Sequence, residues 1–459
     1  MPDAKPVRIT FDEGTIVLHS EPPASLASIS DLQFDKRIGA WRAPAARYEP
    51  VIRALVGAGE AYVDEARSYE ELSLRPLVDR TPRDYQREAL EAWRRSRRRG
   101  VVVLPTGSGK SLVAIMAILE RPRSTLIVAP TIDLMNQWHD LLTTWFDVPV
   151  GTIGGGSYEL HDLTCTTYDS AYIHLGRLGG RFGLVVFDEC HHLPGPSFSV
   201  GAELTIAPFR LGLTATPERP DGRHAMLGRL IGPICYRREI TEMAGGVLSD
   251  YELATIHVEL GEAERKAYDE ARQVFRGYID KYNIRLGGSG GWARFLMEAT
   301  GSEEGRLAFQ AWRTQRRISL ATPRKLRVLE ELLHEHQGER ILVFTADNAT
   351  VYEISRRFLV PAITHRTKSK ERRTTLQRFN DGTWPVLVTS RVLNEGVNIP
   401  EASVGIVLSG SGTVREHVQR LGRILRKVEG KSAKLYEVIA RGTTEESISE
   451  RRRQHDAYR

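Results

Sequence analysis

Apolar and polar residues follow three different patterns along the chain. Up to about residue 80 they alternate in short runs such as 7–11, and a helical pattern follows near 48–58; this mixture is typical of a small α+β domain. From residue 101 onward, unbroken apolar runs such as 184–187 and 341–344 alternate with helical segments, which favours parallel sheets covered by helices on both faces. Between these two kinds of region, 262–317 is charged and helical without a clear strand.

These patterns predict four domains of overall α/β class. A new helix begins near Pro82, after an N-cap and proline signature at 79–82, and the alternation of strands and helices resumes at about residue 322. The predicted segments are an N-terminal α+β domain over 1–80, a parallel-sheet domain over 81–245, a helical insertion or connector over 246–321, and a second parallel-sheet domain over 322–459.

Composition narrows the class of protein. Of the 459 residues 41% are hydrophobic, but no stretch of 18 or more is apolar and uncharged, and the N-terminus lacks the regions of a signal peptide. The three cysteines, Cys165, Cys190 and Cys235, are scattered, which suits a reducing compartment. We therefore expect a cytoplasmic protein with no membrane partner. An excess of Lys and Arg over Asp and Glu, 64 to 58, mildly favours a polyanionic partner.

A phosphate-binding loop follows the apolar run 101–104. Gly107 and Gly109 allow backbone N–H groups to surround phosphates, Lys110 supplies a cation for the β and γ phosphates, and the Ser111 hydroxyl can bind Mg²⁺. Leu104 stands where the strict pattern has its first glycine. The predicted nucleotide-binding residues of this loop are Thr106, Gly107, Ser108, Gly109, Lys110 and Ser111.

An acidic pair follows the buried-strand pattern 184–187. Asp188 can hold Mg²⁺ through water, and Glu189 can orient and deprotonate the water that attacks the γ phosphate. These carboxylates are expected at the carboxyl end of a parallel strand, where open α/β sheets bind their ligands. His191 and His192 lack neighbours at zinc-site spacing, so no structural metal is expected.

Further motifs lie at 83–86, 129–131, 166–168, 214–216, 389–400 and 419–426. Together with the phosphate loop and the acidic pair, they make the chain resemble a superfamily 2 helicase. The resemblance implies two RecA-like domains that use ATP, with Lys110, Asp188, Glu189, Arg423 and Arg426 as catalytic residues. The implied roles of the remaining residues are adenine recognition by Gln86, further ATP contacts by Gly396 and Gln419, DNA contacts by Thr131, Thr167, Thr389 and Arg391, and coupling of hydrolysis to domain movement by Thr214 and Thr216.

Within that superfamily the chain is most similar to the XPB family, particularly its compact archaeal type. The segments that carry this similarity are 188–192, 209–216, 361–366 and 409–412. The resemblance implies a damage-recognition-like N-terminal domain, a thumb-like helical insertion and an ATP-dependent 3′–5′ DNA helicase or translocase of repair or transcription. Its implied partners are single- and double-stranded DNA, with a nuclease as a candidate protein partner, and its implied location is the nucleoid.

One motif departs from the family. The Arg-Glu-Asp element reads Arg219, Pro220, Asp221 here, so it loses its central carboxylate and gains a residue with a fixed φ. Arg219 and Asp221 are still expected to meet DNA. Two alternatives therefore stay open: a translocase that moves along duplex DNA without separating its strands, and an architectural subunit that uses ATP as a conformational switch for a bound nuclease.

Overall fold

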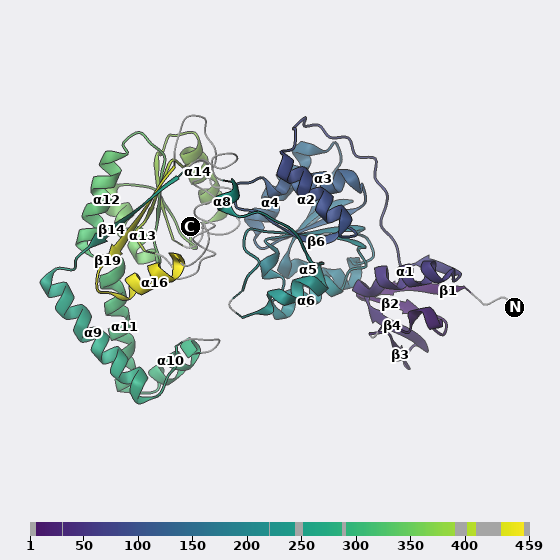
Figure 1. The fold of residues 1–459 in the computed structure, drawn as a ribbon, viewed down its shortest axis with the longest axis horizontal. Coiled ribbons are helices and arrows are strands. Elements are labelled where there is room, and N and C mark those ends of the chain that lie inside the picture. Colours follow the sequence, from purple (N-terminus) through teal and green to yellow (C-terminus); the bar gives the residue numbers. More distant parts are fainter. Residues whose placement is uncertain are drawn as a thin grey trace. The chain divides into compact units, whose positions relative to one another are not determined.

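The computed structural model describes residues 6–29, 31–219, 221–243, 251–286, 291–390, 402–409 and 433–453, and it contains three β-sheets (Figure 1). The chain divides into two compact units, with the division between Arg238 and Glu239. The first unit holds an N-terminal mixed sheet and a large parallel sheet, and the second holds another parallel sheet and a group of long helices. The predicted α/β class with two tandem parallel-sheet domains is confirmed.

The N-terminal sheet has the strand order β3-β4-β2-β1-β5. Its apolar alternation puts Ile9, Ile16 and Leu18 in a core with Val51 and Leu55 of helix α1. β1 and β2 form an antiparallel hairpin joined by a tight turn. The elements are β1 (Val7–Asp12), β2 (Thr15–Leu18), β3 (Gln33–Asp35), β4 (Ala40–Pro44), α1 (Tyr48–Ala58) and β5 (Tyr62–Glu65).

This sheet packs on the parallel sheet of the same unit. Ile206, which precedes strand β12, belongs to the apolar core of the N-terminal sheet, and the Ser68 amide donates a hydrogen bond of 3.0 Å to the Gly180 carbonyl. Contact at Gly14 is so close that a Cβ there would lie 2.3 Å from Leu204 Cδ2. The N-terminal sheet is thus joined to its neighbour through apolar and backbone contacts.

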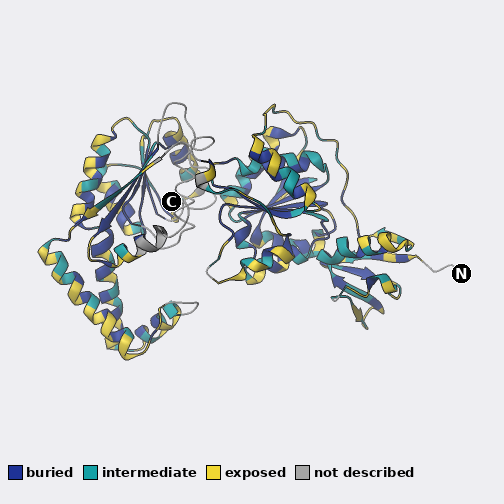
Figure 2. Ribbon diagram, in the orientation of Figure 1, coloured by how far each residue is buried: buried dark blue, intermediate teal, exposed yellow. Residues whose placement is uncertain are grey.

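The large sheet has the order β13-β6-β12-β11-β7-β10-β8-β9, and all its pairs are parallel except β8 with β9. Its central strands are buried along their whole length, because helices cover both faces (Figure 2). The strands are β6 (Arg99–Val103), β7 (Thr125–Ala129), β8 (Val150–Gly154), β9 (Ser157–Tyr158), β10 (Leu163–Thr167), β11 (Leu184–Asp188), β12 (Phe209–Thr214) and β13 (Ile234–Arg237). The helices are α2 (Asp84–Arg95), α3 (Lys110–Glu120), α4 (Ile132–Trp145), α5 (Tyr168–Leu178), α6 (Pro196–Glu203) and α7 (Leu227–Leu230).

The sheet of the second unit has the order β14-β19-β18-β15-β17-β16, with parallel pairs throughout. Its strands are β14 (Tyr251–Val258), β15 (Ile341–Phe344), β16 (Ala362–Ile363), β17 (Val386–Thr389), β18 (Val404–Val407) and β19 (Ala433–Ala440). Its helices are α8 (Ile240–Met243), α12 (Pro323–Glu335), α13 (Asn348–Phe358), α14 (Ser369–Asn380) and α16 (Thr444–Arg453).

The segment predicted as a helical insertion contains one strand as well as three helices. The helices are α9 (Glu262–Lys281), α10 (Gly291–Thr300) and α11 (Glu303–Leu320), and they share an aromatic core around Phe295. Strand β14, however, pairs along its full length with β19. The sheet of the second unit therefore begins before the helices and resumes after them. No helix in the described part of the chain is both long and apolar enough to cross a membrane.

Candidate active site

The phosphate loop connects β6 to α3, as its sequence predicts. Gly107 and Gly109 have φ values of 85° and 80°, a left-handed conformation that glycine adopts without the strain other residues incur. The Lys110 ammonium donates to the carbonyls of Leu104 and Pro105, at 3.2 and 3.4 Å. The loop carbonyls thus surround the lysine whose positive charge is needed to bind phosphates.

Helix α2 braces this loop through Gln86. The Gln86 amide donates to the carbonyls of Ser108 and Gly109, at 3.1 and 3.2 Å, and its oxygen accepts from the Arg83 backbone N–H at 2.9 Å. The hydroxyl of Tyr85 also donates to Ser108 O, at 2.5 Å. Gln86 therefore positions the phosphate loop in this structure, while its contact with adenine stays a prediction.

Asp188 lies buried at the carboxyl end of β11. Its Oδ2 accepts a hydrogen bond of 2.8 Å from the indole N–H of Trp138 on α4, and its Oδ1 accepts one of 2.9 Å from the Glu189 backbone N–H. Burial, and then the neighbouring Glu189 charge, raises the pKa of Asp188 to about 6, whereas the Trp138 hydrogen bond acts in the opposite direction. Trp138 could not be predicted from the sequence, because the contact joins residues far apart in the chain.

Glu189 adopts a left-handed backbone conformation, with φ 46°. Glutamate seldom occupies this region, and such strain gathers at functional sites. Its Oε2 is buried and accepts no hydrogen bond from the described residues, although His191 Nδ1 lies 3.4 Å away. This atom is free to accept a hydrogen bond from a water molecule, as the predicted base requires.

His191 links the acidic pair to the predicted coupling residues. Its Nδ1 lies 3.0 Å from the Thr214 hydroxyl, and that hydroxyl oxygen accepts the Thr216 backbone N–H at 3.2 Å. The His191 carbonyl accepts from Arg219 at 2.8 Å. The structure thus brings the acidic pair and the coupling residues together. His191 lies between them, although the sequence analysis considered it only as a zinc ligand and rejected that role.

Arg219 and Asp221 pair with each other. Two guanidinium nitrogens of Arg219 donate to the two oxygens of Asp221, at 2.9 and 2.6 Å. Hydrogen bonding to Arg219 lowers the pKa of Asp221, which keeps this carboxylate ionised. Pro220, between them, lies outside the described residues.

Two predicted DNA-contacting threonines cap helices. Thr131 Oγ1 accepts the Leu134 N–H at the start of α4, and Thr167 Oγ1 accepts the Ser170 N–H at the start of α5, each at 3.2 Å. Both helix starts lie at the carboxyl edge of the large sheet, beside the turn that follows β8. A Cβ at Gly154, the last residue of β8, would lie 2.9 Å from Ser170 Oγ. The end of β8, which was not predicted as part of the site, therefore adjoins the start of α5.

The predicted residues of the second unit are only partly described. Thr389 ends β17 and is fully buried, with its hydroxyl donating to the Ser390 carbonyl at 3.0 Å. Its contact with DNA stays a prediction that this burial does not favour. The remaining predicted residues, Arg391, Gly396, Gln419, Arg423 and Arg426, lie outside the described residues.

The residues of the first unit fit ATP and Mg²⁺. The Thr106 hydroxyl is buried at the phosphate loop with no hydrogen-bond partner among the described residues, as is Glu189 Oε2. A buried polar atom without a partner is costly, and phosphate and water would supply the partners. Lys110, Ser111 and Asp188 provide the ammonium, hydroxyl and carboxylate that such a nucleotide and cation bind.

This arrangement, two parallel-sheet domains with a phosphate loop and an acidic pair in the first, defines a superfamily 2 helicase. Family models agree: Type III restriction enzyme, res subunit, matches 79–219, and Helicase conserved C-terminal domain matches 324–428. A third model, Xeroderma pigmentosum group B helicase damage recognition domain, matches 9–66. The chain belongs to the XPB family.

Similar proteins support this assignment. A "DNA 3'-5' translocase XPB2" of Sulfurisphaera tokodaii is 42% identical, over 81% of this chain and 84% of that protein. A "DNA 3'-5' helicase XPB" of Mycobacterium tuberculosis is 32% identical over 78% of this chain, which spans 60% of that relative. The crystal structure of the Pyrococcus furiosus Hef helicase domain has a TM-score of 0.53 over 80% of this chain and 97% of its own, at 19% identity, and so shares the fold.

Proposed function

We propose that this protein is a DNA-dependent ATPase that acts as a 3′–5′ DNA helicase or translocase in DNA repair or transcription-linked DNA opening. The observation that carries the proposal is the continuous contact from Asp188 and Glu189 through His191 to Thr214 and Thr216. It supplies a physical connection between the ATP-hydrolysing residues and the motif that couples hydrolysis to movement. The XPB names of its relatives support the same activity.

Each proposed catalytic residue has one role. Lys110 binds the β and γ phosphates, Ser111 and Asp188 hold Mg²⁺, and Glu189 accepts a proton from the attacking water. When bound, Mg²⁺ neutralises charge on the phosphates. Arg423 and Arg426 are proposed to stabilise the charge that develops on the γ phosphate, with Gly396 and Gln419 as further ATP contacts.

A direct test is the substitution Lys110→Ala. It removes the cation over the phosphates from a loop that Gln86 and Tyr85 still hold in place, so the protein should fold normally and lose DNA-stimulated ATP hydrolysis. Circular dichroism and a phosphate-release assay measure the two outcomes. Retained turnover would refute the assignment of the site.

DNA is proposed to lie along the carboxyl edge of the large sheet. Thr131 and Thr167 begin helices there, and helix N-termini favour phosphates. From the second unit, Thr389 and Arg391 are the proposed contacts, of which Thr389 has the weaker support. Contacts with phosphates position a strand without reading its sequence.

A translocase that leaves the duplex closed is the second candidate, favoured by the Arg219–Asp221 pair. Because Asp221 is already bound to Arg219, it is not free to divert a strand by repelling its phosphates, and the usual central carboxylate is absent. Displacement of a strand from a 3′-tailed duplex, measured beside displacement of a third strand from a triplex, separates the two candidates. Triplex displacement alone would establish translocation without unwinding.

A nuclease partner and a location at the nucleoid remain part of the proposal. The names of the relatives support action on DNA; the nuclease and the nucleoid location are proposed from the sequence alone. The third candidate, an architectural subunit, predicts that activity depends on the partner. Recovery of a nuclease with the purified protein, together with cell fractionation, tests these points. The four-domain division is likewise proposed, with the insertion narrowed to α9–α11 because β14 belongs to the second sheet.

A further inference from the structure

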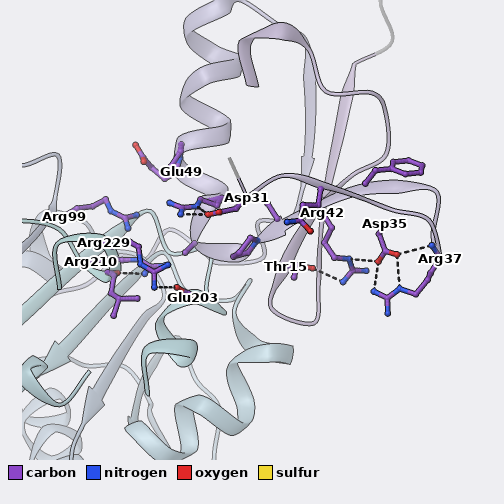
Figure 3. Close-up of a pocket in the computed structure, with 18 of the residues that line it drawn as sticks. Thr15, Asp31, Asp35, Arg37, Arg42, Glu49, Arg99, Glu203, Arg210 and Arg229 are labelled. Atoms are coloured by element: carbon purple, nitrogen blue, oxygen red, sulfur yellow. Dashed lines mark hydrogen bonds and ion pairs between the residues drawn. The ribbon is translucent and has the colours of Figure 1, made fainter. Parts of the chain in front are cut away.

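A cavity of about 760 Å³ lies within the first unit, between the N-terminal sheet and the large parallel sheet (Figure 3). This volume falls in the range of small-ligand sites, roughly 300–1,000 Å³. Its lining includes Arg99, the first residue of β6, and Arg210, the second residue of β12. Both lie at the amino edge of the parallel strands, whereas the phosphate loop and the acidic pair follow the carboxyl ends. The cavity is therefore separate from the proposed ATP and DNA sites.

Two arginines lie directly opposite each other at this cavity. Arg99 and Arg210 are partners in the parallel β6–β12 register, and the charge of Arg99 disfavours the charged form of Arg210. Arg210 is fully buried, and among the described residues its guanidinium donates to backbone carbonyls alone, those of Ala202, Thr205, Ala207 and Leu230, at 2.6 to 3.3 Å. Burial and then Arg99 lower the pKa of Arg210. No carboxylate neutralises Arg210 through these hydrogen bonds.

The acidic residues of the lining are already paired with other arginines. Seven cationic and four acidic side chains line the cavity. The ion pairs of the four acids are Asp31 with Arg47, Asp35 with Arg37, Glu49 with Arg53 at 3.2 Å, and Glu203 with Arg229 at 2.8 Å. Arg99 takes part in none of them, and its Nη1 is buried without a hydrogen-bond partner among the described residues. Arg99 as a whole is half-buried, and the charge of Glu49 acts to stabilise its protonated form, although Glu49 is itself paired with Arg53. A guanidinium nitrogen buried without a hydrogen-bond partner is destabilising unless an acceptor joins it.

We propose that this cavity is an oxyanion site in which Arg99 binds a phosphate group. A guanidinium can donate two parallel hydrogen bonds to phosphate, and a dianion beside Arg99 and Arg210 removes the repulsion between them. The phosphate can belong to a small free ligand or to a DNA strand, and the chemistry of recognition is the same. Because the N-terminal sheet supplies the opposite wall, a bound anion would also stabilise the packing of the two sheets.

The test uses the full chain with a non-hydrolysable ATP analogue and Mg²⁺ present, so that the phosphate loop is filled. Calorimetric titration with inorganic phosphate at constant ionic strength should show one saturable site. Arg99→Gln should weaken phosphate binding at least tenfold. Arg177→Gln is the matched control, since Arg177 is an exposed arginine of the same unit with a side chain 86% accessible, and it should bind phosphate as the unchanged protein does.

A stability measurement distinguishes this site from a structural arginine. Without phosphate, Arg99→Gln should melt at a higher temperature than the unchanged protein, because the charge that repels Arg210 is gone. Phosphate should raise the melting temperature of the unchanged protein, and it should raise that of the variant much less. A variant that melts lower without phosphate, equal phosphate binding in both proteins, or no saturable binding would each overturn the proposal.

Competition between DNA and bound phosphate identifies the source of the phosphate group. A 12-nucleotide DNA with a 5′-phosphate and the same DNA without it are each titrated against bound phosphate. Competition by the phosphorylated strand alone identifies a terminal phosphate, and competition by both identifies backbone phosphates; if neither competes, the bound ligand is a free phosphate compound. If Arg99→Gln does not fold, Arg99→Lys keeps the charge but loses the two-pronged hydrogen bonding, and weaker phosphate binding with unchanged melting is then expected.

Discussion

Asp188 shows how one residue depends on contacts that the sequence does not display. The apolar run before it predicted both its strand and its place at the strand end, and the structure has β11 ending at Asp188. Its partner Trp138, fifty positions earlier, carries no signal of its own, because an apolar residue at helical spacing predicts only burial. His191 was considered only as a zinc ligand, because its contact with Thr214, 23 positions later, has no signal in the local sequence.

Trp138→Phe tests whether this contact supports catalysis. The substitution keeps an aromatic ring in the core and deletes the N–H that orients the Asp188 carboxylate. Hydrogen bonds to charged groups are worth about 1.5–3 kcal/mol, so we expect ATP hydrolysis to fall roughly tenfold or more, with a higher Mg²⁺ requirement for binding a fluorescent ATP analogue. Trp145→Phe, the same change on the same helix, is the control. Equal effects of the two substitutions would show that only packing matters.

Glu189→Gln tests the proposed base. An amide cannot accept the proton of the attacking water, so hydrolysis should fall by about 10²–10⁴-fold. Binding of ATP and Mg²⁺, measured by fluorescence, should change little. A parallel loss of binding and hydrolysis would instead make Glu189 a ligand of the nucleotide or cation.

At the scale of elements, the sequence predicted the regular pieces better than their connections. The helix expected near 48–58 is α1 (Tyr48–Ala58), and the apolar runs became the parallel strands. β14 was not predicted because it is an edge strand of its sheet and most of its described residues are only half-buried, so it has no unbroken apolar run. Its membership of the sheet is set by β19, near the other end of the chain.

Substitutions of Thr131, at the start of α4, can distinguish its role in capping the helix from its proposed contact with DNA. Thr131→Ala removes the cap and should lower the free energy of unfolding by about 1 kcal/mol. Thr131→Asp retains a capping oxygen but adds a negative charge, so it should preserve stability while weakening DNA binding. Chemical denaturation and fluorescence anisotropy with labelled DNA measure these effects. Unchanged DNA affinity in the Asp variant would remove Thr131 from the proposed DNA surface.

At the scale of the whole molecule, the excess of basic residues bears on how DNA is bound. Phosphate contacts release counterions, so DNA affinity should fall steeply and linearly on a logarithmic salt scale. DNA of any sequence should stimulate the ATPase to a similar extent. Anisotropy titrations over a salt series with several unrelated duplexes check both points, and strong preference for one sequence would contradict them.

Arg426→Ala tests cooperation between the two RecA-like domains. An arginine that stabilises the transition state contributes about 10³–10⁵-fold to turnover, so hydrolysis should fall by roughly 10³-fold or more with little change in ATP affinity. Arg426 lies outside the described residues, and its assignment depends on its motif. Comparable losses in affinity and turnover would place it in ground-state binding.

The pairing of β14 with β19 has a consequence for synthesis on the ribosome. The described strands of the first unit precede residue 239, so its sheets can form while the rest of the chain is still being made. β14 emerges soon afterwards, but β19, its neighbour among the described strands, is one of the last of them to be translated. Pairings between such distant segments form slowly. The nascent protein therefore spends most of the second half of translation with an unpaired strand, and premature termination in that half leaves β14 exposed to aggregation.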